Sequence, residues 1–174
     1  TGQNSTTGSS YATLILDSNG IVYATGLNDR GQLGDGTFTN RTVPVRVLKG
    51  AYTGTTYLGD NPNNPIIALS VGQYHSLALA KDGSVYAFGE NVSGELGDST
   101  LTNRNIPIRV KKGLYNGTAF LGDNPANPII GIAAGTSSSM ALALDGTLYS
   151  FGDNNNGQLG DSTTVDKRVP VRVK

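Results

Sequence analysis

The fold is decided by three glycine-spaced stretches: Gly26-Leu-Asn-Asp-Arg-Gly-Gln-Leu-Gly-Asp35, Gly89-Glu-Asn-Val-Ser-Gly-Glu-Leu-Gly-Asp98 and Gly152-Asp-Asn-Asn-Asn-Gly-Gln-Leu-Gly-Asp161. They recur every 63 residues, and residues 11–73 align with residues 74–136 without gaps at 35 identities in 63 positions. A period of this length indicates a repeat architecture. We divide the chain into a polar lead-in at 1–10, expected to be flexible, repeats at 11–73 and 74–136, and a partial third repeat at 137–174.

Each repeat has the pattern of short antiparallel strands. Residues 74–79 alternate small or polar residues with Leu, which predicts a strand. Asp82-Gly83 follows and favours a tight hairpin into residues 84–88, because both turn positions tolerate positive φ. Residues 106–110 include Pro107 and fit an outer strand. Residues 128–135 are almost wholly apolar and predict an inner strand buried on both faces.

This pattern predicts an all-β protein, a partial β-propeller of three four-stranded antiparallel blades with a 63-residue repeat. The first blade is expected to be incomplete, because residues 2–9 align with the inner strand of the next repeat but are too polar for it. A β-solenoid is the alternative, and the Asp-Gly hairpins argue against it. No segment has a sustained helical period, so we expect very little helix.

The sequence resembles the repeats of the regulator of chromosome condensation family, which form β-propeller blades. The resemblance rests on Tyr74-His-Ser-Leu-Ala-Leu79, Asp82-Gly83, Val85-Tyr-Ala-Phe-Gly89, Gly94-Glu-Leu-Gly-Asp98 and Pro107-Ile-Arg-Val110. The family includes nucleotide exchange factors, chromatin-associated proteins and secreted or surface proteins. This chain departs from the usual repeat by an insert at 49–65 and again at 112–128. The inserts, the near-identical copies and the lack of Cys look like bacterial extracellular members, so an extracellular or cell-surface location is expected.

Composition removes several function classes. The 174 residues contain 13 basic and 13 acidic side chains, which does not predict a nucleic-acid partner. No apolar stretch approaches the roughly 20 residues that a membrane helix needs, so no membrane insertion is expected. With no Cys and one His, no thiolate metal site or Cys nucleophile can form. No acid, base or nucleophile cluster recurs with the repeat, and we expect no catalytic residue, no cofactor and no enzyme activity.

The Leu-Gly-Asp triplets are interpreted as turns. A phosphate-binding loop would need a neighbouring Lys and a following helix, and neither is present. We expect glycine at positive φ and an aspartate that caps the turn. The predicted structural turn residues are Gly34, Asp35, Gly97, Asp98, Gly160 and Asp161.

Two further features of the sequence are a segment that looks like a metal-binding loop and a single histidine. Asp153-Asn-Asn-Asn-Gly157 looks like a calcium loop, but Gly157 is fifth where the helix-loop-helix calcium motif needs glycine sixth. A looser calcium site made of backbone carbonyls remains the alternative there. His75 has Ala12 and Ser138 as its repeat equivalents, neither of them titratable, and is interpreted as a packing residue.

The inserts carry the candidate contact residues Tyr52, Tyr57, Tyr115 and Phe120. Exposed aromatics on a proline-stiffened loop bury much area at low entropic cost, which suits binding. The alternative is that they fold back and cover the edge of a blade. A stacking platform for sugars is a third interpretation.

Three blades do not close a ring, since propellers typically use four to eight. We expect either a piece of a longer chain or several copies that assemble through open β edges or insert loops into a ring or filament. The sequence therefore predicts a non-enzymatic extracellular or cell-surface module for protein interaction or self-assembly. The alternatives are a glycan-binding propeller and a guanine nucleotide exchange or chromatin factor.

Overall fold

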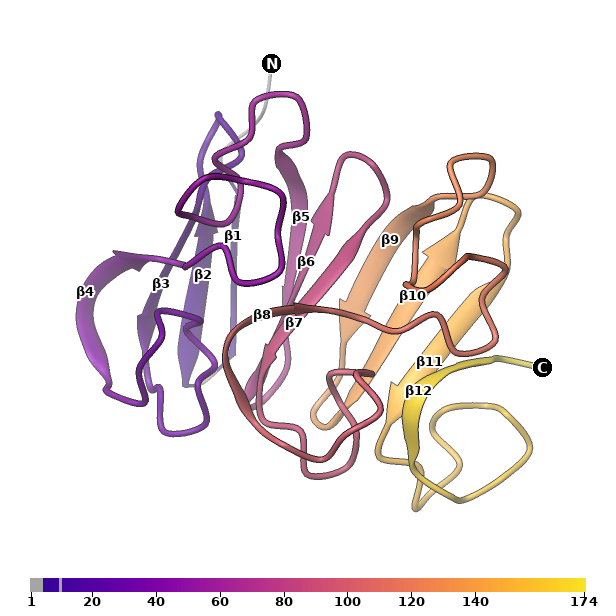
Figure 1. The fold of residues 1–174 in the computed structure, drawn as a ribbon. Coiled ribbons are helices and arrows are strands. Elements are labelled where there is room, and N and C mark those ends of the chain that lie inside the picture. The colour runs from indigo at the N-terminus through magenta and orange to yellow at the C-terminus, as the bar shows by residue number, and fades with distance from the viewer. Residues whose placement is uncertain (1–4, 10) are drawn as a thin grey trace.

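The computed structural model describes residues 5–9 and 11–174 and folds them into three four-stranded antiparallel sheets. Figure 1 shows them side by side in chain order, and we call them blades 1 to 3. Blade 1 contains β1 (Ser5–Gly8), β2 (Ala12–Leu16), β3 (Val22–Gly26) and β4 (Arg41–Arg46). Blade 2 contains β5 (Ile66–Val71), β6 (His75–Ala80), β7 (Val85–Gly89) and β8 (Arg104–Arg109). Blade 3 contains β9 (Ile129–Ala134), β10 (Ser138–Ala143), β11 (Leu148–Gly152) and β12 (Lys167–Arg172). The prediction of three four-stranded blades is confirmed.

The expectation that blade 1 is incomplete is wrong. Residues Ser5–Gly8 form β1, which pairs with β2 from Ser5 opposite Leu16 to Gly8 opposite Thr13. A ladder is made by backbone groups, so polar side chains do not prevent it where they stay exposed, and those of β1 are mostly exposed. The predicted lead-in is therefore a strand over these four residues, while residues 1–4 and 10 lie outside the described part.

The blades are offset from the sequence repeats. The boundaries predicted at 73/74 and 136/137 fall between β5 and β6 and between β9 and β10, each pair within one sheet. A blade therefore takes its inner strand from the end of one sequence repeat and its other three strands from the next.

The inner strands are less buried than their apolar sequences predict. Ile66 and Ile129 are buried, but the side chains of Ile67 and Ile130 are about half exposed, at 51% and 50%. Within the described chain no blade lies across the axis to cover them. The expectation of burial on both faces is wrong for this reason.

Neighbouring blades contact each other through sheet faces. One apolar cluster joins blades 1 and 2, with Leu14 and Leu16 against Ala78 and Phe88. A second joins blades 2 and 3. Within the described residues, this arrangement leaves the outward sheet faces of blades 1 and 3 without a neighbouring blade. Assembly through open β edges or insert loops stays a prediction.

The two ends of the blades are built differently. Hairpins and inserts lie at one end, shown at the top of Figure 1, and the glycine-spaced loops lie at the other. Each insert reaches forward to the next blade: the Ala51 amide donates to the Pro107 carbonyl at 2.9 Å, and the Leu114 amide donates to the Pro170 carbonyl at 2.9 Å. The inserts therefore connect blades in space as well as in sequence.

Candidate functional site

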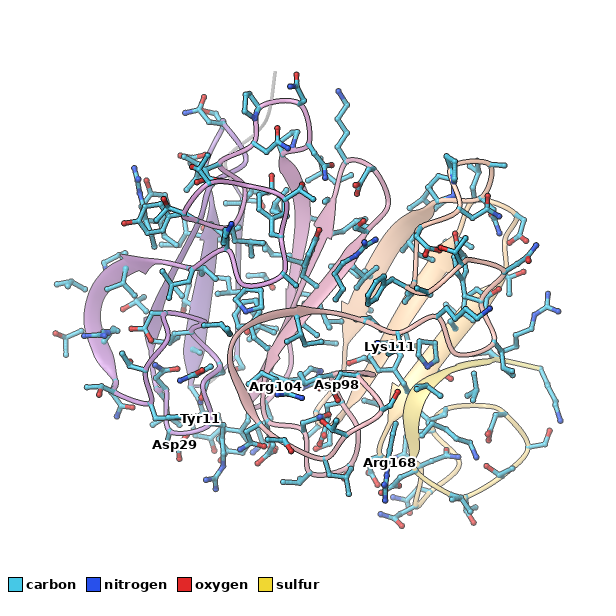
Figure 2. The ribbon with its side chains drawn as sticks, in the orientation of Figure 1. Tyr11, Asp29, Asp98, Arg104, Lys111 and Arg168 are labelled. Atoms are coloured by element: carbon cyan, nitrogen blue, oxygen red, sulfur yellow. The ribbon has the colours of Figure 1, made fainter. Side chains whose placement is uncertain are left out.

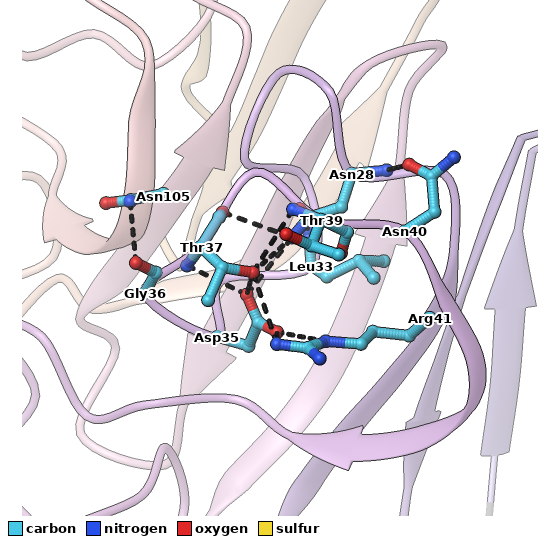
Figure 3. A network of polar contacts seen from close by, with 9 residues as sticks. All are labelled: Asn28, Leu33, Asp35, Gly36, Thr37, Thr39, Asn40, Arg41 and Asn105. Carbon is cyan, nitrogen blue, oxygen red and sulfur yellow. Dashed lines mark hydrogen bonds and ion pairs between the residues drawn. The ribbon is translucent and has the colours of Figure 1, made fainter.

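The three glycine-spaced loops at 27–40, 90–103 and 153–166 are each built around one buried asparagine. In blade 1 the Asn28 Nδ2 donates to the Asp35 carboxylate at 3.0 Å and to the carbonyl of Thr37 at 3.1 Å, while its Oδ1 accepts the Leu33 amide at 2.9 Å (Figure 3). The same bonds recur in the other two blades around Asn91 and Asn154. One side chain thus fixes both arms of each loop.

An ion pair joins each loop to the outer strand that follows it in the sequence. Asp35 pairs with Arg41 at 2.6 Å, Asp98 with Arg104 at 2.7 Å, and Asp161 with Lys167 at 3.0 Å. Figure 2 shows Asp98 and Arg104 next to each other. Burial alone would raise the pKa of these aspartates. The hydrogen bonds from the following Thr and from the paired cation outweigh burial, so the pKa of Asp35 and that of Asp98 are lowered.

The predicted turn residues lie inside these networks. Gly34, Gly97 and Gly160 have φ of 64°, 61° and 64°, in the region that favours glycine. Each following aspartate accepts hydrogen bonds from the amide and the hydroxyl of the Thr two residues later. The loops are therefore held rigidly by local bonds.

Each rigid loop exposes an apolar side chain. Phe38 is 53% exposed and Leu101, its repeat equivalent, is 43% exposed. In the third loop Val165, one position further along, is 64% exposed. We call these three the loop tips. None of the three is among the candidate contact residues expected from the sequence, although an apolar residue between two threonines in a polar loop was a signal for Phe38 and Leu101.

Two contacts join blades 1 and 2 at the same end of the molecule. The rings of Tyr11 and Tyr74 stack with centroids 5.1 Å apart. The Arg30 guanidinium lies 3.1 Å from the Glu90 carboxylate. Neighbouring blades therefore present a continuous surface next to the loops.

The candidate aromatics of the inserts separate into two pairs. Tyr52 and Tyr115 are only 2% exposed and pack edge-to-face on Tyr86 and Tyr149 of the next blade. The hydroxyl of Tyr52 donates to the carbonyl of Asn64. For these two residues the structure shows the alternative in which the aromatic folds back, so they are not surface contact residues.

Tyr57 and Phe120 are half-buried beneath cations. The guanidinium of Arg46 lies 5.0 Å from the centre of the Tyr57 ring, and that of Arg109 lies 4.5 Å from the centre of the Phe120 ring. Their role in contact with a partner stays a prediction. An open stacking platform for a sugar is not supported here, because each ring has a guanidinium over it.

His75 is buried between blades 2 and 3. Its Nε2 lies 3.0 Å from the hydroxyl of Ser139, which itself donates to the carbonyl of Glu95. Burial lowers the pKa of His75 to about 4, so the imidazole is neutral at pH 7. Its surroundings are those of the packing residue that the sequence analysis expects.

Glu95 is a buried acid that the sequence analysis did not single out. It occupies the position of Gln32 and Gln158, and its Oε2 accepts the Ser93 amide at 2.8 Å. Its Oε1 is buried without a hydrogen-bond partner. Burial and the nearby carboxylates of Glu90 and Asp153 raise its pKa. The signal for it was an acid at a position that is Gln in the other two repeats.

Among residues 5–9 and 11–174, no group of three or more His, Cys, Asp or Glu side chains is placed to hold a metal ion. Both Asp153 oxygens of the former calcium candidate accept hydrogen bonds, from Asn155 and from Gln158. No helix in the described part is long and apolar enough to cross a membrane.

Comparison with known proteins identifies the repeat. The family model of the regulator of chromosome condensation (RCC1) repeat matches residues 19–79, 82–142 and 145–174. A bifunctional serine/threonine-protein kinase/NEDD4-like E3 ubiquitin-protein ligase of Dictyostelium discoideum is 33% identical over 91% of this chain and 8% of its own length. The RCC2 homolog of Danio rerio is 36% identical over 86% of this chain and 26% of its own. The chain thus spans a small part of these relatives.

Solved structures agree on the fold. Prp20p from Saccharomyces cerevisiae, described with its binding properties to Gsp1p and histones, matches with a TM-score of 0.73 at 23% identity. The match covers 98% of this chain and 38% of Prp20p. Human WBSCR16 matches with a TM-score of 0.54 at 21% identity, over 99% of this chain and 53% of that protein.

These comparisons correct one expectation and confirm another. The extracellular or cell-surface location is contradicted, because the relatives found include RCC2 proteins and ubiquitin ligases. Nothing in the comparisons supports a bacterial surface type. The recognised repeat is confirmed over most of the sequence, and the chain belongs to the regulator of chromosome condensation (RCC1) repeat family.

Proposed function

We propose that the chain is a non-catalytic module that binds protein through its loop end. The observation that carries this is the recurrence of the loop tips Phe38, Leu101 and Val165 on loops fixed by buried asparagines. An apolar side chain on a rigid loop loses little conformational entropy on binding, so more of the contact energy appears as affinity. Repeated tips favour an extended partner surface such as another protein.

The other residues of the site support a binding role without catalysis. The only histidine is buried and neutral, and the loop aspartates are held in ion pairs. The ligase and kinase names of some relatives belong to proteins of which this chain matches 8% and 14%. No observation here favours the glycan or the exchange-factor alternative over general protein binding.

Binding to purified proteins tests the proposal. Gsp1p and core histones are suitable probes, because Prp20p is described with both. We expect at least one to bind in biolayer interferometry, with affinity reduced about tenfold or more in Phe38→Ser/Leu101→Ser, as expected when central apolar contacts are lost. The control is Val43→Ser, since Val43 is an apolar residue that is more exposed than Phe38 and Leu101 but lies on β4.

Two outcomes contradict the proposal. One is the absence of binding to either probe. The other is an equal loss in the loop-tip variant and in Val43→Ser, which would show that the loops are not the contact surface. Faster nucleotide release from Gsp1p on binding would instead indicate the exchange-factor alternative.

A further inference from the structure

The basic residues of this chain lie almost entirely on its outer strands. Residues 41–49, 104–112 and 167–174 contain β4, β8 and β12 with the residues that directly follow them. These three segments hold eleven of the 13 basic side chains and none of the 13 acidic ones. The chain as a whole carries no net charge, so the separation of charge becomes visible only when the sequence is placed on the fold.

Some of these cations already have partners, and others do not. Three pair with the loop aspartates, and two arginines lie over aromatic rings of the inserts. Lys111, Lys112 and Arg168 are exposed, and none of them forms an ion pair within the described part of the chain. The Lys112 Nζ donates to the carbonyl of Gly117 at 3.2 Å, a neutral acceptor that leaves the charge of the lysine uncompensated.

These three cations meet where the second insert contacts the next blade. The Leu114 amide donates to the Pro170 carbonyl at 2.9 Å, and Leu114 itself is 63% exposed. Lys111 and Lys112 directly precede this contact in the sequence, and Arg168 lies two residues before Pro170 on β12. Figure 2 shows Lys111 and Arg168 on the same side of the molecule. We call Lys111, Lys112, Leu114 and Arg168 the basic junction.

The equivalent contact between blades 1 and 2 has the same backbone bond but less charge. The Ala51 amide donates to the Pro107 carbonyl, also at 2.9 Å. Lys49 occupies the position of Lys112 in this first junction. The other three positions hold Leu48, Ala51 and Asn105. Ala51 and Lys49 are exposed with a further blade and insert following them, so a following repeat does not cover these positions.

The chemistry of the basic junction fits an acidic segment of a polypeptide. An exposed leucine among cations can be covered by an apolar side chain, while carboxylates on either side approach the lysines and the arginine. A nucleic acid would use the charges but not the leucine. The neighbouring ring of Phe120 is not open for a base to stack on, because Arg109 and Lys111 lie over it at 4.5 and 5.0 Å.

We propose that the basic junction is a docking surface for an acidic polypeptide segment with an apolar residue at its centre. The carboxylates of the segment pair with Lys111, Lys112 and Arg168, and its apolar side chain packs on Leu114. None of these residues is a loop tip, so variants can separate this surface from the one proposed above to bind protein.

Fluorescence anisotropy with a labelled peptide tests the proposal. The probe is a short peptide of Asp and Glu with a pair of Leu at its centre. At low salt we expect one peptide to bind per protein, with affinity reduced about tenfold or more in Lys111→Glu/Lys112→Glu/Arg168→Glu. The affinity of the wild-type protein should fall as salt is added, because salt screens exposed charges.

The first junction provides the matched control. Lys112→Glu and Lys49→Glu make the same change of net charge at equivalent positions. We expect Lys112→Glu to lower affinity about three- to fivefold and Lys49→Glu to lower it less than about twofold, because only the first of these lies in the basic junction.

The first junction can also be converted into a second binding site. Leu48→Lys/Ala51→Leu/Asn105→Arg installs the residues of the basic junction and should raise the number of peptides bound per protein from one to two. Circular dichroism checks that the variant folds. If it does not, Ala51→Leu/Asn105→Arg replaces it.

Several results would overturn the proposal. One is a folded wild-type protein that does not bind the peptide, and another is an equal loss in Lys112→Glu and Lys49→Glu. Equal binding of a peptide with Ser in place of Leu shows that Leu114 makes no contact. Tighter binding of a single-stranded oligonucleotide, lost in the triple Glu variant, identifies a nucleic acid instead. Self-association of wild-type protein at low salt, lost in the same variant, identifies a second copy as the occupant.

Discussion

Blades 2 and 3 share the repeated sequence pattern but differ in how many of their faces are covered. Blade 2 lies between two neighbours, and its strands β6 and β7 are buried at every position. Blade 3 has one neighbour, and its strand β10 alternates between buried and partly exposed residues. The loop networks at the ends of the two blades are nevertheless the same. Burial of the sheet thus depends on the neighbouring blade, whereas the loops are fixed within each blade.

The largest expected effect compares a leucine that the neighbouring blade covers with its equivalent on blade 3, which is partly exposed. Leu79→Ala should destabilise the protein by about 2–5 kcal/mol, because it leaves a cavity in the cluster between blades 2 and 3. Leu142→Ala, at the equivalent position on the side of blade 3 that points away from blade 2, should cost less than about 1 kcal/mol, because Leu142 is already partly open to solvent in the described chain. Urea unfolding of both variants measures the difference. Equal costs would show that something covers blade 3 in solution.

The loop asparagines should show no such contrast. Asn91→Ala and Asn154→Ala each remove several hydrogen bonds from a fully buried side chain. We expect a loss of about 2–3 kcal/mol in both, because the partners are left unpaired. The measurement is again urea unfolding. A clearly smaller loss in Asn154→Ala would mean that the loops also depend on the following blade.

Glu95 offers a contrast that depends on pH. Burial raises the pKa of Glu95 above the usual value for a glutamate, so the folded state prefers the protonated acid, and stability falls as pH rises from about 4.5 through the folded pKa. Glu95→Gln should therefore stabilise the protein by about 1–2 kcal/mol at pH 7 and by little below pH 4. Thermal unfolding from pH 3.5 to 7.5 tests this.

The control for Glu95 lies in blade 3. Gln158→Glu changes the equivalent residue, which is exposed in the described chain. The variant loses the hydrogen bond from Gln158 to Asp153, but solvent screens the new charge, so we expect only a small decrease in the melting temperature at pH 7. A loss comparable to the gain from Glu95→Gln would contradict the role of burial.

The smallest effect concerns the second insert, which links the two blades. Asp123 accepts the amides of Thr118, Ala119 and Phe120, and although burial raises its pKa, these bonds lower it to about 2. Its contribution to stability is present above pH 3.8 and is lost as pH falls through about 2. Asp123→Asn should speed hydrogen exchange of the three amides severalfold with little change in global stability. Unchanged exchange would show that the insert is held by other contacts.

The repeat made most of the fold predictable from sequence. Asp82-Gly83 marks a hairpin because both turn positions tolerate positive φ, and Gly83 has φ of 88°. β1 was missed because its ladder uses the backbone alone and leaves no apolar signal. The burial of Tyr52 was one of three open interpretations, because the sequence of an insert does not show which part of the neighbouring blade it contacts. The loop tips were missed because exposure depends on the network around Asn28, which only the folded loop brings together.

The contacts between each insert and the next blade bear on how the number of 63-residue units can change in this kind of protein. The contacts between blades repeat with the 63-residue unit: the Ala51 amide donates to the Pro107 carbonyl, and the Leu114 amide, one unit further along, donates to the Pro170 carbonyl, one unit after Pro107. Removing residues 74–136 would join β5 directly to β10, a strand of the same type as β6. Gains or losses of whole units therefore keep every remaining interface between blades in phase, whereas the loss of one residue within a strand turns its following side chains to the opposite face of the sheet. Lengthening or shortening by unequal exchange in steps of one unit is thus compatible with the fold.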